Sequence, residues 1–162
     1  MSTYKANIKW ESDSPDTFTK SRYTRGHTWS FDGGVEVPAS SSPHSVRPPY
    51  SVEAAIDPEE ALVAAAASCH MLTFLWLAAK KGFTIDSYED NAVGEMTTAM
   101  DGKQFISKIT LDPRIEWSGE TRPTATEITE LHHAAHEGCY IANSIKSDII
   151  VAGIENQLTA VS

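Results

Sequence analysis

Residues 57–83 read DPEEALVAAAASCHMLTFLWLAAKKGF and have the features of one long helix. Asp57 is a good N-cap, Pro58 suits the first helical position, and Gly82 is a typical stop after the last turn. Between the acidic first turn and the basic last turn, His70 is the only strongly polar side chain. An ordinary surface helix has a polar face. We therefore expect this helix to be buried on nearly all sides.

Length and charge limit the classes of function. The chain has 162 residues, which predicts a single domain, residues 1–162, large enough to bury a core. A net charge of -9 argues against binding to nucleic acid or to an anionic membrane surface, because both require clustered Lys and Arg. The N-terminus lacks a basic segment followed by an apolar one, so we expect no signal peptide and a cytoplasmic protein. The apolar stretch 61–79 is interrupted by polar residues and favours a core helix over a membrane span.

The segment before the long helix predicts strands followed by a loop. Residues 4–10 alternate apolar and polar side chains, as in a half-buried strand. A second strand or a hairpin is expected over 23–31, where Arg25 has the same parity as several aromatic residues. In a regular strand Arg25 would point with them towards the core, whereas a bulge at Gly26 would undo this parity. Residues 35–51 are rich in Ser and Pro, and we expect a long loop of the kind that is often functional.

The segment after the long helix predicts a hairpin, a helix and a strand. Residues 84–99 and 103–117 form two alternating runs joined by Met-Asp-Gly, a strong hairpin signal. Residues 124–137 form a helix that opens with a capping box and ends at a glycine. Residues 147–159 predict a final strand. The fold class is therefore α+β, with helices packed on antiparallel sheets.

The two cysteines, Cys69 and Cys139, allow three interpretations. The first is that each is a buried, inert side chain, since free cysteine behaves as a small hydrophobe. Zinc is the second possibility, because His70 follows one cysteine and His136 precedes the other. Adjacent helical residues lie about 100° apart, however, so Cys69 and His70 do not converge easily on one ion. The third interpretation is a redox pair, in keeping with a reducing compartment.

A redox role requires a cation near the nucleophile. Burial alone raises the pKa of a thiol, and Cys69 lies too far from the helix N-terminus to gain from its dipole. An inward-facing Arg25 would supply the charge, and a buried guanidinium itself requires an anionic partner. Cys139 follows the C-terminus of a helix, where the dipole disfavours a thiolate, so Cys69 is the better nucleophile.

Three short blocks resemble those of one known superfamily. They are Asp-Pro-Glu at 57–59, Ser-Cys at 68–69 and Ala-His-Glu-Gly-Cys at 135–139. Their types and spacing are similar to those of the osmotically inducible protein C and organic hydroperoxide resistance protein superfamily. The resemblance extends over nearly the whole chain and includes the order of the elements.

The resemblance implies a thiol-dependent peroxidase with an OsmC-like fold, an intertwined homodimer whose active sites lie at the subunit interface. It implies that Cys69 is the peroxidatic cysteine and Cys139 the resolving one. It also assigns Glu59 as the carboxylate that pairs with an active-site arginine, for which Arg25 is the candidate and Arg22 the alternative. The implied substrate is an organic hydroperoxide, and the reductant a dithiol that can be of the lipoyl type. We expect no metal and no bound cofactor.

One geometric expectation follows from these assignments. In an unbroken helix Glu59 and Cys69 would lie about 15 Å apart along the axis, too far for one arginine to contact both. We therefore expect a break between them. The apolar side chains that share the face of Cys69 favour an organic peroxide over hydrogen peroxide, and His70 is expected to be a core histidine. The competing class of function is a non-catalytic binding or stress protein on the same fold.

Overall fold

The computed structural model describes residues 1–12, 15–154 and 157. Its contacts group the chain into two compact units, Met1–Ala61 and Leu62–Ser162. The boundary falls inside the long helix α2, Pro58–Lys80, so one element contributes to both units. The single domain over residues 1–162 stays a prediction, and each unit is described by itself.

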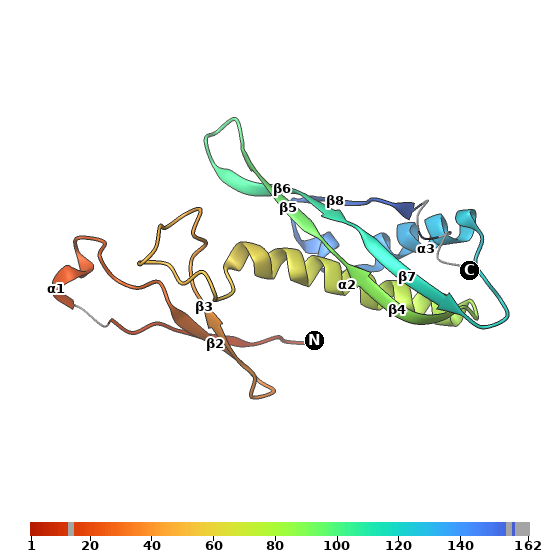
Figure 1. The fold of residues 1–162 in the computed structure, drawn as a ribbon, viewed down its shortest axis with the longest axis horizontal. Helices are drawn as coiled ribbons and strands as arrows, with labels where there is room; N and C mark the ends of the chain where they lie inside the picture. Colours follow the sequence, from red (N-terminus) through yellow and green to blue (C-terminus); the bar gives the residue numbers. More distant parts are fainter. Residues whose placement is uncertain (13–14, 155–156, 158–162) are drawn as a thin grey trace. The chain divides into compact units, whose positions relative to one another are not determined.

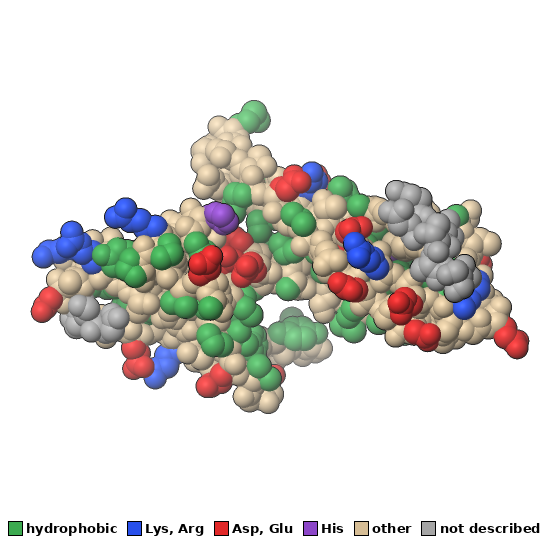
Figure 2. All heavy atoms as spheres, in the orientation of Figure 1, with side chains coloured by type: hydrophobic (Ala, Val, Ile, Leu, Met, Phe, Trp, Pro, Cys, Tyr) green, Lys and Arg blue, Asp and Glu red, His purple; other side chains and the backbone are tan. Residues whose placement is uncertain are grey.

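The first unit contains a small antiparallel sheet (Figure 1). Its strands are β1 (Ala6–Lys9), β2 (His27–Phe31) and β3 (Glu36–Ala39), in that order, and a short helix α1 (Pro15–Phe18) follows β1. Trp29 lies opposite Ile8 on β1 and Val37 on β3. Hydrophobic side chains of this unit reach the surface, as the green atoms in Figure 2 show. They include Tyr4, Ile8, Phe18, Phe31 and Val35.

Two expectations for this unit need correction. The strand predicted over 23–31 begins only at His27, because the residues before it enter a cluster of Trp10, Phe18 and Tyr23 rings. The parity argument for Arg25 is therefore wrong. The predicted loop 35–51 contains strand β3, which pairs with β2 and so satisfies the backbone groups of that strand.

Helix α2 begins and ends as its sequence predicts. The Glu60 amide donates to Asp57 Oδ1 at 2.8 Å, and the Asp57 amide donates to Glu60 Oε2 at 3.1 Å, which closes a capping box. Gly82 follows with φ +82°. The helix is uninterrupted from Pro58 to Lys80, so the expected break is wrong. The residues between Glu59 and Cys69 include no Pro or Gly, and the alanine run has the highest helix propensity.

Burial along α2 is confined to one face of the helix in this chain. The fully buried residues follow one another at intervals of four and are Ala66, His70, Phe74 and Ala78. On the opposite side Leu72 is 61% exposed and Trp76 60% exposed. The expectation of burial on nearly all sides is thus not met within one chain. By length and composition alone α2 could cross a membrane, a test that core helices of soluble proteins also pass.

The second unit has two sheets instead of one long hairpin. The runs 84–99 and 103–117 each divide into two strands: β4 (Thr84–Asp90), β5 (Val93–Thr98), β6 (Gln104–Leu111) and β7 (Pro113–Ser118). β4 pairs with β7, and β5 pairs with β6 across the predicted turn at 100–102. The Asp112 amide donates to Asp90 Oδ1 at 2.8 Å. This bond links the end of β4, before β5 begins, to the residue between β6 and β7.

The last strand also differs from its prediction. β8 covers Asp148–Val151 and pairs with β6 in the parallel sense, so this sheet is mixed and not purely antiparallel. The prediction extended to 159, but residues 155–156 and 158–162 lie outside the described residues. The α+β class holds, with mainly antiparallel pairing.

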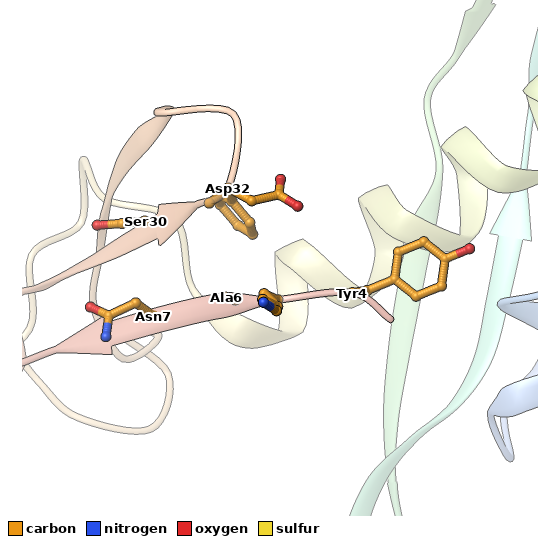
Figure 3. A pocket seen from close by; sticks show the side chains of 7 residues that line it. Tyr4, Ala6, Asn7, Ser30 and Asp32 are labelled. Atoms are coloured by element: carbon orange, nitrogen blue, oxygen red, sulfur yellow. The ribbon is translucent and has the colours of Figure 1, made fainter. Parts of the chain in front are cut away.

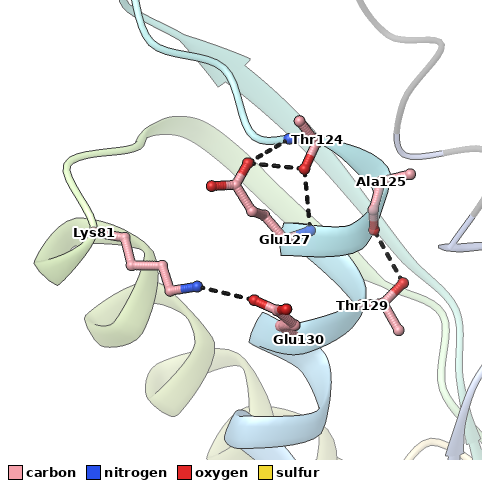
Figure 4. A network of polar contacts seen from close by, with 6 residues as sticks. All are labelled: Lys81, Thr124, Ala125, Glu127, Thr129 and Glu130. Carbon is pink, nitrogen blue, oxygen red and sulfur yellow. Dashed lines mark hydrogen bonds and ion pairs between the residues drawn. The ribbon is translucent and has the colours of Figure 1, made fainter.

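Helix α3 (Ala125–Gly138) confirms its sequence signals closely. Thr124 and Glu127 form the predicted capping box, and Lys81 after α2 pairs with Glu130 of α3 at 3.4 Å (Figure 4). The core between α2, α3 and the β4–β7 sheet is aromatic and aliphatic. It consists of Phe74, Ala78, Phe83, Ile115, Trp117, Ile128, Leu131 and Ala135. This core places the middle of α2 beside the C-terminal end of α3.

Candidate functional site

The two cysteines meet where α2 and α3 pack together. Cys69 lies in the middle of α2 and is half-buried, whereas Cys139 caps α3 and is completely buried. Both are free, and their side chains lie close enough for Cys69 to raise the pKa of the Cys139 thiol. The close approach depends on Gly138, since a Cβ there would lie 3.0 Å from Thr73 Cγ2. Thr73 is held in turn by its hydroxyl, which donates to the Cys69 carbonyl at 2.9 Å.

Opposing influences act on Cys139. Burial raises the pKa of the Cys139 thiol, and the neighbouring Cys69 side chain raises it further. The Ala142 amide donates to Cys139 Sγ at 3.3 Å and, with the Ile141 amide, lowers that pKa. These amides open a short 3-10 helix, η1 (Ala142–Ser144), which follows α3. The net direction of the pKa of Cys139 is upward, which favours the protonated form of this thiol.

A buried pair of histidines lies next to the cysteines. His70 Nε2 and His132 Nδ1 are 3.0 Å apart, and His132 Nε2 lies 2.9 Å from Gln157 Oε1. Burial lowers the pKa of His70 to about 4, helped by the nearby His132 and His136, and burial also lowers the pKa of His132. His70 is thus the expected core histidine, although its Nδ1 atom has no hydrogen-bond partner among the described residues. The sequence carried no signal for its pairing with His132.

The zinc interpretation gains no support from this arrangement. Within residues 1–12, 15–154 and 157, no three His, Cys, Asp or Glu side chains are grouped so that they could hold a metal ion. His136 is half-buried near the end of α3, and its part in the chemistry stays open to test.

Arg25 lies in the first unit, just before β2. Its guanidinium stacks on the Tyr23 ring at 3.8 Å, and Nη1 donates to the carbonyls of Ser21 and Tyr23 at 3.0 and 2.6 Å. The side chain is half-buried by these contacts and not by a strand face, and it forms no ion pair with a described residue. Arg22 is exposed.

Glu59 lies in the first turn of α2 and is half-buried. It forms no ion pair within the described part of the chain. Because α2 is continuous, Glu59 and Cys69 of one chain are separated by about 15 Å along the axis. The two cysteines therefore lie together in the second unit. Arg25 and Glu59 belong to the first unit.

A hollow of about 590 Å³ lies along β1 and the end of β2 (Figure 3). Asn7 and Ser30, which face each other across the two strands, line it together with Tyr4 and Asp32. None of the four predicted site residues contributes to this hollow. It is a feature of the sheet surface and not part of the cysteine site.

Comparison with solved structures places this arrangement among known folds. A structure of an OsmC-like protein of unknown function from Vibrio cholerae is 46% identical, with a TM-score of 0.90 over 93% of this chain and 98% of that one. An organic hydroperoxide resistance protein from Elizabethkingia anophelis is 15% identical, with a TM-score of 0.67 over 93% of each chain. The organic hydroperoxide resistance protein OhrB of Bacillus subtilis is 18% identical, with a TM-score of 0.61 over 92% of this chain and 94% of that one.

The family comparison covers more than half of the chain. The search of curated proteins gave no match. The family model described as OsmC-like protein matches residues 51–152, a span that contains Glu59, Cys69 and Cys139 but not Arg25. Together with the identity to the Vibrio cholerae protein, this match shows that the chain belongs to the OsmC-like protein family.

Proposed function

We propose that the protein is a thiol-dependent peroxidase that reduces organic hydroperoxides to alcohols. The observation that carries the proposal is the contact between the Cys69 and Cys139 thiols, which come from distant parts of the sequence. Two inert core cysteines have no reason to meet, whereas a peroxidatic and a resolving cysteine must approach to within disulfide range. The organic hydroperoxide resistance proteins that share the fold support the same class of reaction.

The roles follow from exposure and protonation. Cys69 is partly exposed and so can meet a substrate, whereas burial raises the pKa of Cys139 and favours its protonated form. The Cys69 thiolate attacks the distal oxygen of the hydroperoxide, the O–O bond breaks, and the alkoxide takes a proton and leaves as an alcohol. Cys69 is left as a sulfenic acid. The Cys139 sulfur then attacks Cys69 Sγ and expels water, which forms the Cys69–Cys139 disulfide.

A homodimer would complete the site. On one continuous helix Glu59 lies too far from Cys69 for both to share an arginine. We therefore assign Glu59 and Arg25, with Arg22 as the alternative, to a site shared between two copies of the chain. Within the described part of the chain, Arg25 donates to carbonyls through Nη1 alone, which leaves its other N–H groups to bind a thiolate or carboxylate. The exposed Leu72 and Trp76 side of α2 supplies an apolar contact surface.

Apolar neighbours favour an organic substrate. Leu62, Ala66, Thr73 and Trp76 lie within about two turns of Cys69 on its side of α2. An alkyl or aryl group gains from such surroundings, whereas hydrogen peroxide does not. A dithiol, including the lipoyl type, would reduce the disulfide by exchange. We place this reaction in the cytoplasm.

Thiol titration tests the proposed function. The reduced protein, Cys69→Ser and Cys139→Ser are each treated with one equivalent of cumene hydroperoxide, and free thiols are counted before and after. The parent should lose two thiols and form an intramolecular disulfide, and Cys139→Ser should form a sulfenic acid that a dimedone probe captures. Cys69→Ser should not react. An unchanged number of free thiols in the parent would contradict the proposed peroxidase activity and favour a non-catalytic binding protein.

A further inference from the structure

We propose that the reductant attacks the Cys69 sulfur of the disulfide, and that the Ala142 amide stabilises the Cys139 thiolate that leaves. This inference rests on the proposed function, because it concerns the second half of the same cycle. It assigns a direction to a reaction that has two chemically possible courses, since either sulfur of a disulfide can be attacked.

Access to solvent distinguishes the two sulfurs. Cys139 has no exposed surface, because it lies under the end of α3 and beside α2. Cys69 is half-buried and retains exposed surface. An incoming thiolate has to approach along the S–S axis, from the side opposite the leaving sulfur. Of the two cysteines, Cys69 is the one with exposed surface from which such an approach can begin.

Leaving-group chemistry works against this direction unless it is assisted. A thiol leaves faster when its pKa is low, and burial raises the pKa of Cys139. The Ala142 amide supplies the assistance, since it donates to Cys139 Sγ at 3.3 Å and acts in the opposite direction to burial. A hydrogen bond to a charged acceptor is about twice as strong as a neutral one, so this contact gains strength as the thiolate forms.

The turn that carries this amide is held by its own hydrogen bonds. The Asn143 amide donates to the Cys139 carbonyl at 3.1 Å, and Asn143 Nδ2 donates to the Glu137 carbonyl at 3.0 Å. The Ser144 hydroxyl donates to the Tyr140 carbonyl at 2.6 Å. Ala142 is therefore directed at the sulfur before any charge develops, as preorganised donors at anionic sites are.

The reduction step balances with a dithiol reductant. One reductant thiolate forms a bond to Cys69 Sγ, and the Cys69–Cys139 bond breaks with its electron pair on Cys139 Sγ. The second reductant thiol, after losing its proton, attacks its partner sulfur in the mixed disulfide and releases Cys69 as a thiolate. The reductant is oxidised to a disulfide, and Cys139 takes up a proton to restore the starting state.

Mapping of a trapped mixed disulfide tests the direction. The disulfide is made with diamide, which needs no peroxidase activity, and is mixed with 2-mercaptoethanol in a quenched-flow device. Excess N-ethylmaleimide stops the reaction, and peptides are analysed by mass spectrometry. The mercaptoethanol adduct should lie on Cys69 and the maleimide on Cys139. An adduct on Cys139, an even mixture, or failure of diamide to form the disulfide would overturn the proposal. A protein that fails to reduce peroxides but gives the expected mixed disulfide would contradict the proposed function and not the direction of attack.

The Ala142→Pro variant tests whether the amide at position 142 stabilises the leaving thiolate, because proline has no N–H group. Ala142→Pro should slow reduction of the disulfide about tenfold, the size of one hydrogen bond to a charged group. Sulfenic acid formation at Cys69, measured in the Cys139→Ser background, should not change by this factor. Ala142→Ser keeps the amide and should be reduced at least fivefold faster than Ala142→Pro. Equal rates for the two variants would remove the amide from the proposal.

Proline after a residue in the right-handed helical region is disfavoured, and Ile141 has φ -69° and ψ -44°. If circular dichroism shows that Ala142→Pro does not fold, Asn143→Ala replaces it. This variant loses the Nδ2 bond that holds the turn but keeps every backbone amide. It should slow reduction about threefold while the mixed disulfide still maps to Cys69. An unaltered rate would count against the preorganised amide.

Discussion

The buried His70 should make the stability of the protein fall steeply in mild acid. Its pKa is about 6.5 in an unfolded chain and about 4 in the folded one. Between these values the unfolded state binds more protons, so the stability present above pH 6.5 is lost as the pH falls towards 4. For this one group the loss between pH 7 and pH 5 is about 2 kcal/mol, rising to about 3 kcal/mol at pH 4. His132, with its pKa also lowered, adds in the same direction.

Urea unfolding followed by tryptophan fluorescence measures this loss at pH 7, 6 and 5, at one protein concentration. His70→Gln keeps an amide donor towards His132 but cannot titrate, so its free energy of unfolding should depend less on pH by about 2 kcal/mol over that range. His133→Gln is the matched control, because His133 is exposed on α3, next to the buried His132. It should follow the parent. Equal pH dependence in the parent and His70→Gln would refute the reasoning.

Three substitutions test the packing of the second unit. Gly94→Ala should lower the free energy of unfolding by about 1–3 kcal/mol in urea titrations, because its Cβ would lie 2.6 Å from Val63 Cγ2; an effect below 0.5 kcal/mol would contradict this. Gly138→Ala should slow diamide-driven disulfide formation severalfold by pushing against Thr73, and an unchanged rate would show that the helices adjust. Thr124→Ala should cost about 1 kcal/mol of stability through loss of the N-cap, and a neutral result would show that the cap is unimportant.

Local signals predicted the two long helices, α2 and α3, and one turn of this fold because their causes are local. Thr124, Asp57 and the glycines at helix ends act within one or two turns, and the Asp-Gly hairpin needs only its neighbours. The division of the strands has a non-local cause. Asp90 binds the Asp112 amide across the sheet, and alternation of side chains cannot show where two strands separate into different sheets.

The parts of the candidate site that depend on rare residue types could be predicted from the sequence. The parts that depend on backbone conformation could not. Cys69 and Cys139 stood out through their rarity and the blocks around them. The parity argument for Arg25 failed because the strand starts later, and the burial of Arg25 comes from stacking on Tyr23. The Ala142 amide has no side-chain signature, so only the structure reveals it.

The meeting of Cys69 and Cys139 has a thermodynamic consequence. A bond between them would close a covalent loop that contains β4–β7 and the whole of α3. Closing a loop of that length lowers the entropy of the unfolded chain and is worth about 4 kcal/mol of stability in the chain-entropy account. A protein that cycles through this bond would alternate between a more and a less stable form. Each turnover would thus form and break a covalent link between the middle of α2 and the end of α3.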